Sequence, residues 1–185
     1  MRLFVAVKIP EEIREKAAAV AGELPAEAVS RVSAGNMHYT LQFLGDVDAP
    51  DANAKIKEIK DALDAVEFQP FDVAVKGIGF FPNENFARVV WLGTEEENEK
   101  PLKELADKIK DALGPLGFKP DYPFSAHLTI ARVKQKIGAE KLREMMKRYK
   151  DTEFGRFNVS SFYLVKSALS PKGAVYEYLK EFRAR

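Results

Sequence analysis

The sequence predicts an α+β fold with two lobes, built from a β-α-β-α-β unit that occurs twice along the chain. Three observations support this prediction. Segments with strand patterning are separated by segments with helical periodicity, matching segments recur at nearly constant spacing, and no linker or low-complexity stretch interrupts the 185 residues. We expect a single two-lobed domain over residues 1–185, with pseudo-repeats of about 1–85 and 86–170 and a closing strand over 174–182.

The first repeat contains three predicted strands and two predicted helices. Residues 3–9 have the apolar pattern of a strand, and the proline that follows suits the first turn of a helix over 11–22. Residues 36–44 form a second strand and residues 71–81 a long third one. Between these two strands, residues 51–66 place their apolar side chains on one stripe and predict a helix.

The second repeat follows the same order. Residues 88–92 predict a strand, and residues 95–113 predict a helix that ends at a Gly-Pro pair. A strand over 127–133 and a helix over 139–149 come next. Residues 157–166 predict the last strand of the repeat, and a Pro-Lys-Gly turn leads from it into the closing strand.

The spacing between matching segments suggests an internal duplication with a pseudo-two-fold axis. Any α+β domain can be divided into a rough repeat, so the spacing alone leaves both interpretations open. A motif repeated at matching positions favours the duplication. The matching residues are Val5 and Val90, His38 and His127, and Val75 and Val165, which are 85, 89 and 90 positions apart.

Composition excludes several functional classes. With 29 Lys and Arg against 28 Asp and Glu, any surface that attracts nucleic acid must be a local patch. The absence of cysteine excludes disulfides, a thiolate nucleophile and cysteine-ligated metal centres. No apolar run approaches the roughly 20 residues that span a bilayer, and no signal peptide begins the chain, so we expect no membrane partner and a cytoplasmic location. The charged fraction of 31% without cysteine favours a thermophilic source.

The two histidines of the sequence each open the same motif, His-x-Thr-apolar. The motifs begin at His38 and His127, and Thr40 and Thr129 follow two positions later. Residues i and i+2 of a strand point the same way, so each motif places an imidazole beside a hydroxyl on one face. Imidazole exchanges protons near neutral pH. Two such strands facing each other would present all four groups to one small anion, which predicts a phosphoester site.

Strict alternation assigns the other residues of these two strands to faces. Gln42 would lie on the side of the first histidine, while Leu41 and Phe43 would lie on the opposite, apolar side. On the second strand, Ala131 would share the side of the histidine and Ile130 would lie opposite. The apolar sides are expected to pack under helices.

Cleavage of a phosphoester beside a ribose hydroxyl needs one group that deprotonates the nucleophile and another that protonates the leaving oxygen. Two imidazoles in opposite protonation states supply both at neutral pH, each worth about 10²–10⁴-fold in rate. Threonine hydroxyls would hold the non-bridging oxygens as negative charge develops. This scheme requires neither a metal nor another cofactor.

Other interpretations of the histidines have less support. A single strand histidine is more often structural than catalytic, but two in identical motifs at matching positions argue against that role. Catalytic zinc usually takes three protein ligands, whereas only two imidazoles exist here, without His-x-x-x-His or Glu-x-x-His spacing. The sequence lacks Gly-x-Ser-x-Gly, Gly-x-x-x-x-Gly-Lys and Gly-x-Gly-x-x-Gly patterns, so a serine hydrolase and a nucleotide cradle have no motif to support them.

The chain resembles the two-histidine phosphoesterases, and within them the RNA 2′,3′-cyclic phosphodiesterases once called 2′-5′ RNA ligases. The resemblance extends almost from end to end. Many members carry proline before the second histidine, where this chain has Ala126. The segments that carry the resemblance are MRLFVAV at 1–7, NMHYTLQFLG at 36–45, GFFP at 79–82, RVVWLG at 88–93, FSAHLTIAR at 124–132 and SPKGAVY at 170–176.

The resemblance implies a bilobal fold with two antiparallel sheets and flanking helices around a central cleft that holds both motifs. It also implies hydrolysis of an RNA 2′,3′-cyclic phosphate end to a 2′-phosphate. On this analogy His38 is the proton donor to the departing 3′ oxygen, and His127 is the proton acceptor that activates water. Thr40, Thr129 and Arg132 would bind the phosphate, with no metal and no other cofactor.

Several residues near the motifs have two interpretations each. Strict alternation places Arg132 on the face opposite to the second histidine, so it reaches the cleft only if the strand twists, bulges or ends there; otherwise it is a solvated surface arginine. Phe81, Tyr122 and Phe124 would stack on a base or belong to the core. A basic stretch over 134–150 would follow an RNA backbone or form a solvated helix face.

Three functional alternatives stay open. Ligation of tRNA halves through a 2′-5′ link reverses the cleavage with the same residues, and a non-catalytic nucleotide- or RNA-binding module would keep the cleft without turnover. A cyclic phosphodiesterase could also act on a small nucleotide. The expected partner is RNA or a nucleotide with a 2′,3′-cyclic phosphate end, and the expected state is a monomer. The donor and acceptor roles depend on the resemblance, because the pseudo-symmetry makes the two imidazoles nearly equivalent.

Overall fold

The computed structural model describes residues 1–47, 52–120, 122–171 and 173–185. These residues form nine strands and four α-helices. In chain order the elements are β1 (Arg2–Lys8), α1 (Glu11–Gly22), β2 (Val29–Arg31), the 3₁₀ turn η1 (Ala34–Asn36), β3 (His38–Asp46), α2 (Ala52–Asp64), β4 (Phe71–Phe81), β5 (Val89–Thr94), α3 (Glu96–Leu113), the 3₁₀ turn η2 (Gly114–Leu116), β6 (Leu128–Val133), α4 (Ala139–Tyr149), β7 (Glu153–Val159), β8 (Ser161–Ser170) and β9 (Gly173–Arg183).

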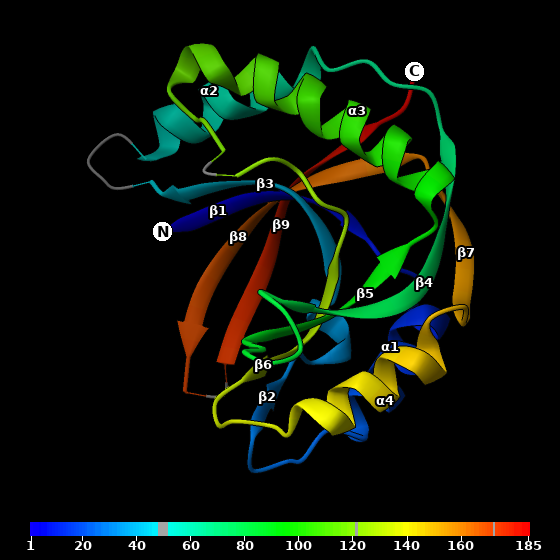
Figure 1. Ribbon diagram of the computed structural model, residues 1–185. Helices are drawn as coiled ribbons and strands as arrows, with labels where there is room; N and C mark the ends of the chain where they lie inside the picture. Colours follow the sequence, from blue (N-terminus) through cyan, green and yellow to red (C-terminus); the bar gives the residue numbers. More distant parts are fainter. Residues whose placement is uncertain (48–51, 121, 172) are drawn as a thin grey trace.

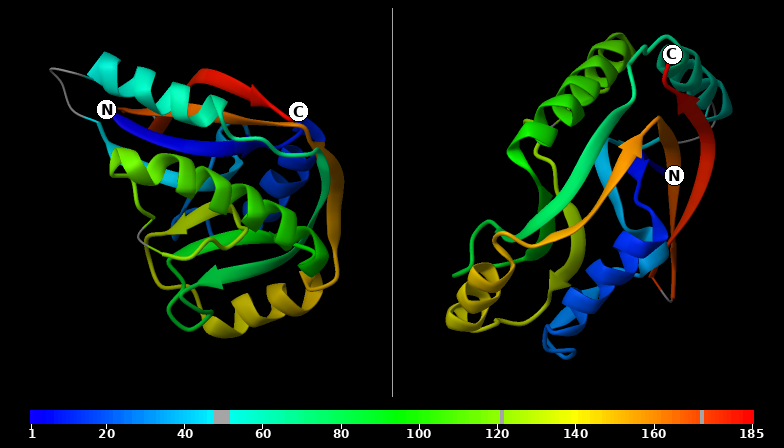
Figure 2. Two further views of the ribbon diagram at one scale, coloured as in Figure 1. Left: turned by 90° about the horizontal axis from the view of Figure 1, so that it is seen from above. Right: turned by 90° about the vertical axis from the view of Figure 1, so that its right-hand side faces the viewer.

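All strand pairs are antiparallel, and the strand order is β7-β4-β5-β6-β3-β1-β8-β9, with β2 pairing with β6 (Figure 1). β3 and β6 share a single residue pair, Tyr39 with Leu128. The sheet therefore divides there into a terminal half, β3-β1-β8-β9, and a middle half, β7-β4-β5-β6 with β2. Figure 2 shows the two halves inclined to each other. The predicted α+β class is confirmed, and the two expected antiparallel sheets are the halves of this sheet.

Read outward from the central join, the strands lie in the order β3-β1-β8-β9 on one side and β6-β5-β4-β7 on the other. The first two strands of each predicted repeat correspond in this order, and the third strands, β4 and β8, are exchanged between the halves. β4, which comes from the first half of the sequence, pairs only with β5 and β7. β8, from the second half of the sequence, pairs with β1, and β9 pairs with β8. Each half of the sheet is thus assembled from distant segments of sequence, which holds the two lobes together as one structure.

The main hydrophobic core lies between the sheet and the helices. α3 buries Leu102, Leu105, Ile109 and Leu113, whose spacing of three or four residues forms one helical stripe. α2 and α3 lie together at one end of the molecule, and α1 and α4 lie at the other (Figure 1). In the described part of the chain, no helix is long and apolar enough to cross a membrane.

β1 is buried on both of its faces. Leu3, Val5 and Val7 belong to the main core. Phe4 and Ala6 point the other way and form a second, smaller apolar cluster with a valine of β8. This explains why residues 3–7 are apolar on both faces. The second cluster also forms the apolar surface on which the first histidine stacks.

Several predicted boundaries differ from the structure. The strand predicted over 157–166 is wrong as a single element, because β7 ends at Val159 and β8 begins at Ser161. The apolar pattern continues through Ser160 without Gly or Pro, although the chain there leaves the middle half for the terminal half. The short β2 follows no clear pattern and was not predicted. Asp51, the predicted first residue of the second helix, lies outside the described residues.

Candidate active site

The pair that joins the two halves of the sheet also brings the two motifs together. Tyr39 and Leu128 are fully buried and face the main core. Their neighbours along the strands must face the opposite side of the sheet. Extending this antiparallel register by one residue places His38 across from Thr129 and Thr40 across from His127. The four predicted groups therefore share one face at the centre of the sheet, which we call the cleft face.

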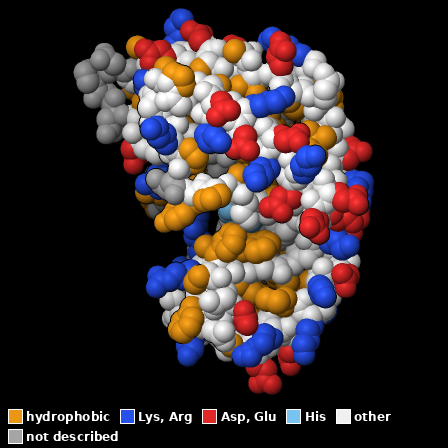
Figure 3. Space-filling model, turned by 45° about the horizontal axis from the view of Figure 1, so that its top comes forward, with side chains coloured by type: hydrophobic (Ala, Val, Ile, Leu, Met, Phe, Trp, Pro, Cys, Tyr) orange, Lys and Arg blue, Asp and Glu red, His pale blue; other side chains and the backbone are white. Residues whose placement is uncertain are grey.

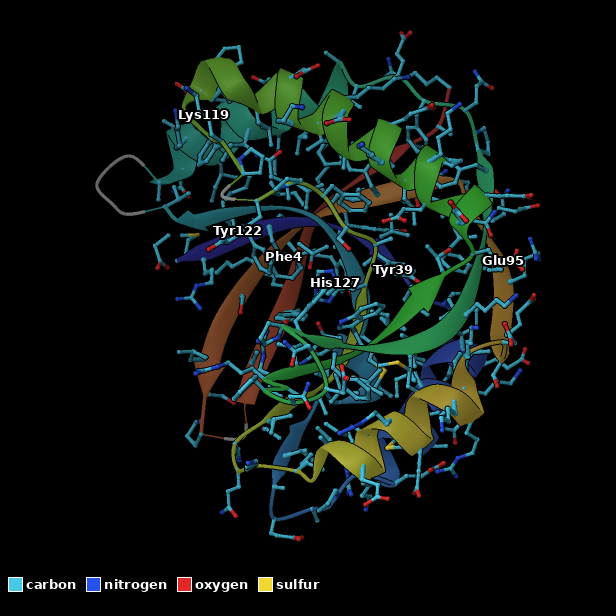
Figure 4. All side chains as sticks on the ribbon, in the orientation of Figure 1. Phe4, Tyr39, Glu95, Lys119, Tyr122 and His127 are labelled. Carbon is cyan, nitrogen blue, oxygen red and sulfur yellow. The ribbon has the colours of Figure 1, made fainter. Side chains whose placement is uncertain are left out.

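The tyrosine of the first motif also ties the two halves together through its side chain. The Tyr39 hydroxyl donates a hydrogen bond of 2.9 Å to the carbonyl of Gly93 on β5, across β6. Burial raises the pKa of this tyrosine, so its hydroxyl stays protonated and acts as the donor. Figure 4 shows Phe4, Tyr39 and His127 gathered where the two halves meet.

The imidazole of His38 is held on both sides. Its Nδ1 lies 2.7 Å from the carbonyl oxygen of Asn36, and its Nε2 lies 2.9 Å from the hydroxyl oxygen of Thr40. Because a carbonyl only accepts, Nδ1 carries the proton of the neutral ring and Nε2 accepts from Thr40. The ring stacks on Phe4 at 4.8 Å and meets the edge of Tyr176 at 5.4 Å between centroids.

The imidazole of His127 is oriented in the same way. Its Nδ1 lies 2.8 Å from the carbonyl oxygen of Ser125, two residues earlier, as Asn36 is two residues before the first histidine. The Phe81 ring contacts the imidazole edge to face at 5.1 Å and packs on Trp91 at 5.0 Å. Each ring thus has Nδ1 on a backbone carbonyl and directs Nε2 away from that carbonyl, as a pair of proton-transfer groups requires.

Burial lowers the pKa of His38 to about 4, and the backbone hydrogen bond to Asn36 opposes this shift. The charges of His127 and Arg132 lower the pKa further. His38 is therefore neutral at pH 7 in the free protein, and a bound anion would favour its protonation.

A bulge in β6 decides the position of Arg132. Val90 pairs with Ala131 and Trp91 pairs with Thr129, so Ile130 has no partner across the ladder. Ile130 and Ala131 are consequently both buried, and the next residue returns to the face of Thr129. The assignment of Ala131 to the histidine side is therefore wrong. Arg132, which strict alternation places on the opposite face, instead lies exposed on the cleft face.

β3 carries the same kind of bulge. Ala6 pairs with Thr40 and Val5 pairs with Gln42, so Leu41 is skipped. Gln42 turns into the protein interior, where its side-chain amide donates to the carbonyl of Phe118 at 3.3 Å. Phe43 returns to the cleft face and is 57% exposed. The predicted faces of Gln42 and Phe43 are therefore wrong, because the alternation breaks at the bulge.

Comparison with known proteins identifies the family. The model of the AKAP7 2′5′ RNA ligase-like domain matches residues 7–183. The chain belongs to this family. Two relatives named RNA 2′,3′-cyclic phosphodiesterase, from Archaeoglobus fulgidus and Methanocaldococcus jannaschii, are 41% and 40% identical over 98% of this chain, covering 99% and 100% of their own lengths. Their source organisms fit the thermophilic composition. The structure of E. coli LigT complexed with 3′-AMP has a TM-score of 0.79 and 28% identity, covering 99% of this chain and 97% of that one.

Among the other predicted residues of this 2′5′ RNA ligase-like chain, one contacts a histidine of the candidate site and the others lie at different places. Phe81 contacts the second histidine, as described. Tyr122 is 82% exposed in the loop before β6, and Phe124 packs against the main core. In Figure 3, hydrophobic side chains gather around a hollow in which a histidine is visible. α4 buries Leu142 and Met145 in the main core, so the basic residues of this helix project away from the cleft face.

Two further observations concern binding groups. Within the described ranges, no group of three or more His, Asp or Glu residues is arranged to hold a metal ion. A polar pocket of about 440 Å³ at the start of α3 contains none of the predicted site residues. Its Lys76 and Glu95 lie 3.6 Å apart, and Glu95 also binds Arg156. These two charges of the pocket are therefore already paired within the protein.

Proposed function

We propose that this protein hydrolyses RNA 2′,3′-cyclic phosphate ends to 2′-phosphates by two-histidine acid–base catalysis. One observation carries the proposal. Two imidazoles from different halves of the sheet share one face, each with Nδ1 on a backbone carbonyl and Nε2 directed away from that carbonyl. The name of the relatives and the 3′-AMP bound to E. coli LigT support this assignment.

The reaction balances with these residues alone. His127 accepts a proton from water through Nε2, and the water oxygen bonds to phosphorus. The bond from phosphorus to the 3′ oxygen breaks, and protonated His38 donates its proton to that oxygen, which leaves the phosphate on the 2′ oxygen. The anionic cyclic phosphate supplies the charge that favours protonation of His38 on binding.

The remaining predicted residues would hold the phosphate. Thr40 and Thr129 present hydroxyls beside the two imidazoles, and each would donate to a non-bridging oxygen. Arg132 lies beyond the bulge on the same face and would add a charge-assisted hydrogen bond as negative charge builds up. In this proposal no step uses a metal ion.

The proposal is tested with an RNA oligonucleotide that ends in a 2′,3′-cyclic phosphate. We expect conversion to a 2′-phosphate end, undiminished by EDTA, with the product isomer identified by phosphorus NMR. Formation of a 3′-phosphate, or loss of turnover on chelation that added metal restores, would contradict the proposal. Tight binding of the oligonucleotide without any turnover would instead support a non-catalytic binding module.

Ligation is the second candidate, because the family model is described as 2′5′ RNA ligase-like. The 5′-hydroxyl of a second RNA would take the place of water: its oxygen would bond to phosphorus, the bond from phosphorus to the 3′ oxygen would break, and a 2′-5′ link would form. Incubation of tRNA halves with the protein would reveal joined product. Because water is far more concentrated than any RNA end, we propose hydrolysis as the main reaction.

We also propose that the two β-α-β-α-β units arose by internal duplication and that the protein acts as a monomer. The corresponding positions of the first two strands of each repeat, on the two sides of the central join, support the duplication. Both histidines, both threonines and the arginine come from one chain, which supports a monomeric enzyme. Light scattering would measure the mass in solution.

A further inference from the structure

The cleft face of the terminal half extends well beyond the histidine. Across the β1–β8 ladder Ala6 pairs with Tyr163, and across the β8–β9 ladder Val165 pairs with Tyr178. Directly paired residues of a sheet share a face. Tyr176 contacts both Phe4 and the first histidine. Three tyrosines from two neighbouring strands therefore line the same face as the catalytic groups, and we call Tyr163, Tyr176 and Tyr178 the tyrosine strip.

A lysine lies over this strip. The Nζ of Lys8 is 4.1 Å from the ring centre of Tyr163 and 3.8 Å from that of Tyr178. Lys8 pairs directly with His38 across the β1–β3 ladder, so its backbone adjoins the catalytic strand. Cation–π contacts hold the ammonium group in place, and its N–H bonds remain available because the side chain is exposed.

A second cation belongs to α1, the helix that the chain enters directly after β1 and Lys8. Arg14 of α1 has a buried Nε without a hydrogen-bond partner among the described residues. Burial raises the pKa of Tyr178, and the charge of Arg14 opposes that rise. In the part of the chain that the structure describes, neither Lys8 nor Arg14 forms an ion pair with a carboxylate. Glu181, which accepts from the Tyr163 hydroxyl at 2.8 Å, is paired with Arg183 instead.

Aromatic faces beside cations that lack acidic partners are the combination that binds single-stranded nucleic acid. The protein as a whole is nearly neutral, so attraction for an anionic ligand must come from a local patch such as these unpaired positive charges. We infer that the tyrosine strip with Lys8 and Arg14 binds the RNA strand immediately 5′ to the cyclic phosphate. A base stacks on the ring of Tyr178, which is 39% exposed, and the adjoining backbone phosphate binds Lys8 and Arg14. This inference rests on the proposed function and adds that the preferred substrate is an oligonucleotide rather than a mononucleotide.

The test compares a trinucleotide with a mononucleotide, both ending in a 2′,3′-cyclic phosphate. For Lys8→Met we expect the ratio of the two kcat/KM values, trinucleotide over mononucleotide, to fall about fivefold or more. The control is Lys166→Met, which removes the same charge from β8 on the other face, where the lysine pairs with Glu177. A decrease of the same size in the control, or an equal loss on both substrates for Lys8→Met, would overturn the inference.

Salt dependence and a tyrosine variant give independent readouts. The slope of log kcat/KM for the trinucleotide against log salt should become shallower by about 0.7 in Lys8→Met, the contribution of one phosphate contact to single-stranded RNA. Tyr178→Leu should lower the same ratio about fivefold or more, whereas Tyr178→Phe, which keeps the ring, should leave it near the wild-type value. An unchanged slope, or an equal effect of both tyrosine variants, would contradict the inference.

Failure of the proposed function would be distinguishable from failure of this inference. If the wild type hydrolyses neither substrate, the proposed function is wrong. Binding of a fluorescent trinucleotide with a 2′-phosphate end, measured by anisotropy, then tests the strip alone. Weaker binding by Lys8→Met than by Lys166→Met supports the inference, and equal binding refutes it.

Discussion

Phe43 and Arg132 occupy equivalent places in the two motifs. Each lies five residues after a histidine, and each is returned to the cleft face by a bulge that buries the two residues before it. The chemistry differs between the two places, because one is aromatic and the other cationic. The two ends of the candidate site are therefore different despite the similar strands, and a phosphate bound near both imidazoles would have positive charge on the Arg132 side.

Replacement of Arg132 tests this arrangement. Arg132→Met should lower kcat/KM for the cyclic phosphate about 10- to 100-fold, the range expected for one charge-assisted hydrogen bond. It should also raise the pKa of His38, because the arginine charge contributes to the lowered value. NMR titration of the imidazole would measure this shift. Lys134→Met, two residues further along and exposed, should change both quantities far less; equal effects would show that only net charge matters.

Either histidine should be required for turnover. His38→Ala and His127→Ala should each reduce kcat by about 10² or more, because each imidazole transfers a proton in the proposed reaction. His38→Asn and His127→Asn, which leave a polar side chain of intermediate size, should be equally inactive. Circular dichroism and thermal melting would show that the variants are folded. Near-full activity of any folded variant would refute the assigned roles.

The buried imidazole makes stability depend on pH. His38 titrates near 6.5 in the unfolded chain and at about 4 in the folded protein. Between these values the unfolded chain binds more protons, so the free energy of unfolding decreases as the pH falls from 6.5 to 4, by on the order of 3 kcal/mol. Urea unfolding of the wild type and His38→Asn across this range would measure the difference, because the carboxylate contributions are common to both. Parallel curves would contradict the prediction.

The close contact of Gly79 with Trp91 supports the wall behind the second histidine. A Cβ added at Gly79 would lie 2.2 Å from Cζ2 of Trp91. Gly79→Ala must displace the indole, and with it the Phe81 ring that contacts His127. We expect a loss of about 1–3 kcal/mol in stability together with reduced kcat.

Gly22→Ala is the matched control, since no atom lies within 4 Å of the added Cβ. It should leave activity unchanged and alter stability by no more than about 1 kcal/mol. If Gly79→Ala has the melting temperature and kcat of this control, the indole is not fixed in the way described here.

Local periodicity was sufficient to predict that both histidines and both threonines share one face, but not to predict their surroundings. The placement of a histidine beside a threonine depends on two-residue alternation, which holds in β3 and β6 up to the threonine. Beyond it, bulges at Leu41 and Ile130 reverse the alternation, and neither residue differs from an ordinary strand residue. The faces of Phe43 and Arg132 therefore could not be read from the pattern.

The other differences have the same origin in tertiary structure. The chain leaves β7 and enters β8 at Ser160 because it crosses between the halves of the sheet, and no local turn signal marks that crossing. The surface formed by the tyrosine strip and Lys8 combines segments of the chain that are 170 positions apart, as Lys8 and Tyr178 are. No local sequence motif could have predicted this surface.

The strand order also determines when the enzyme can assemble during synthesis. Among the described strands, β1 leaves the ribosome before its neighbour β8, and β4 emerges before both of its neighbours. A nascent chain that stops after β4 has no complete half of the sheet, since β5, β6, β7 and β8 are still missing. Contacts between such distant segments slow folding, so β8 must be synthesised before both histidines have a rigid frame.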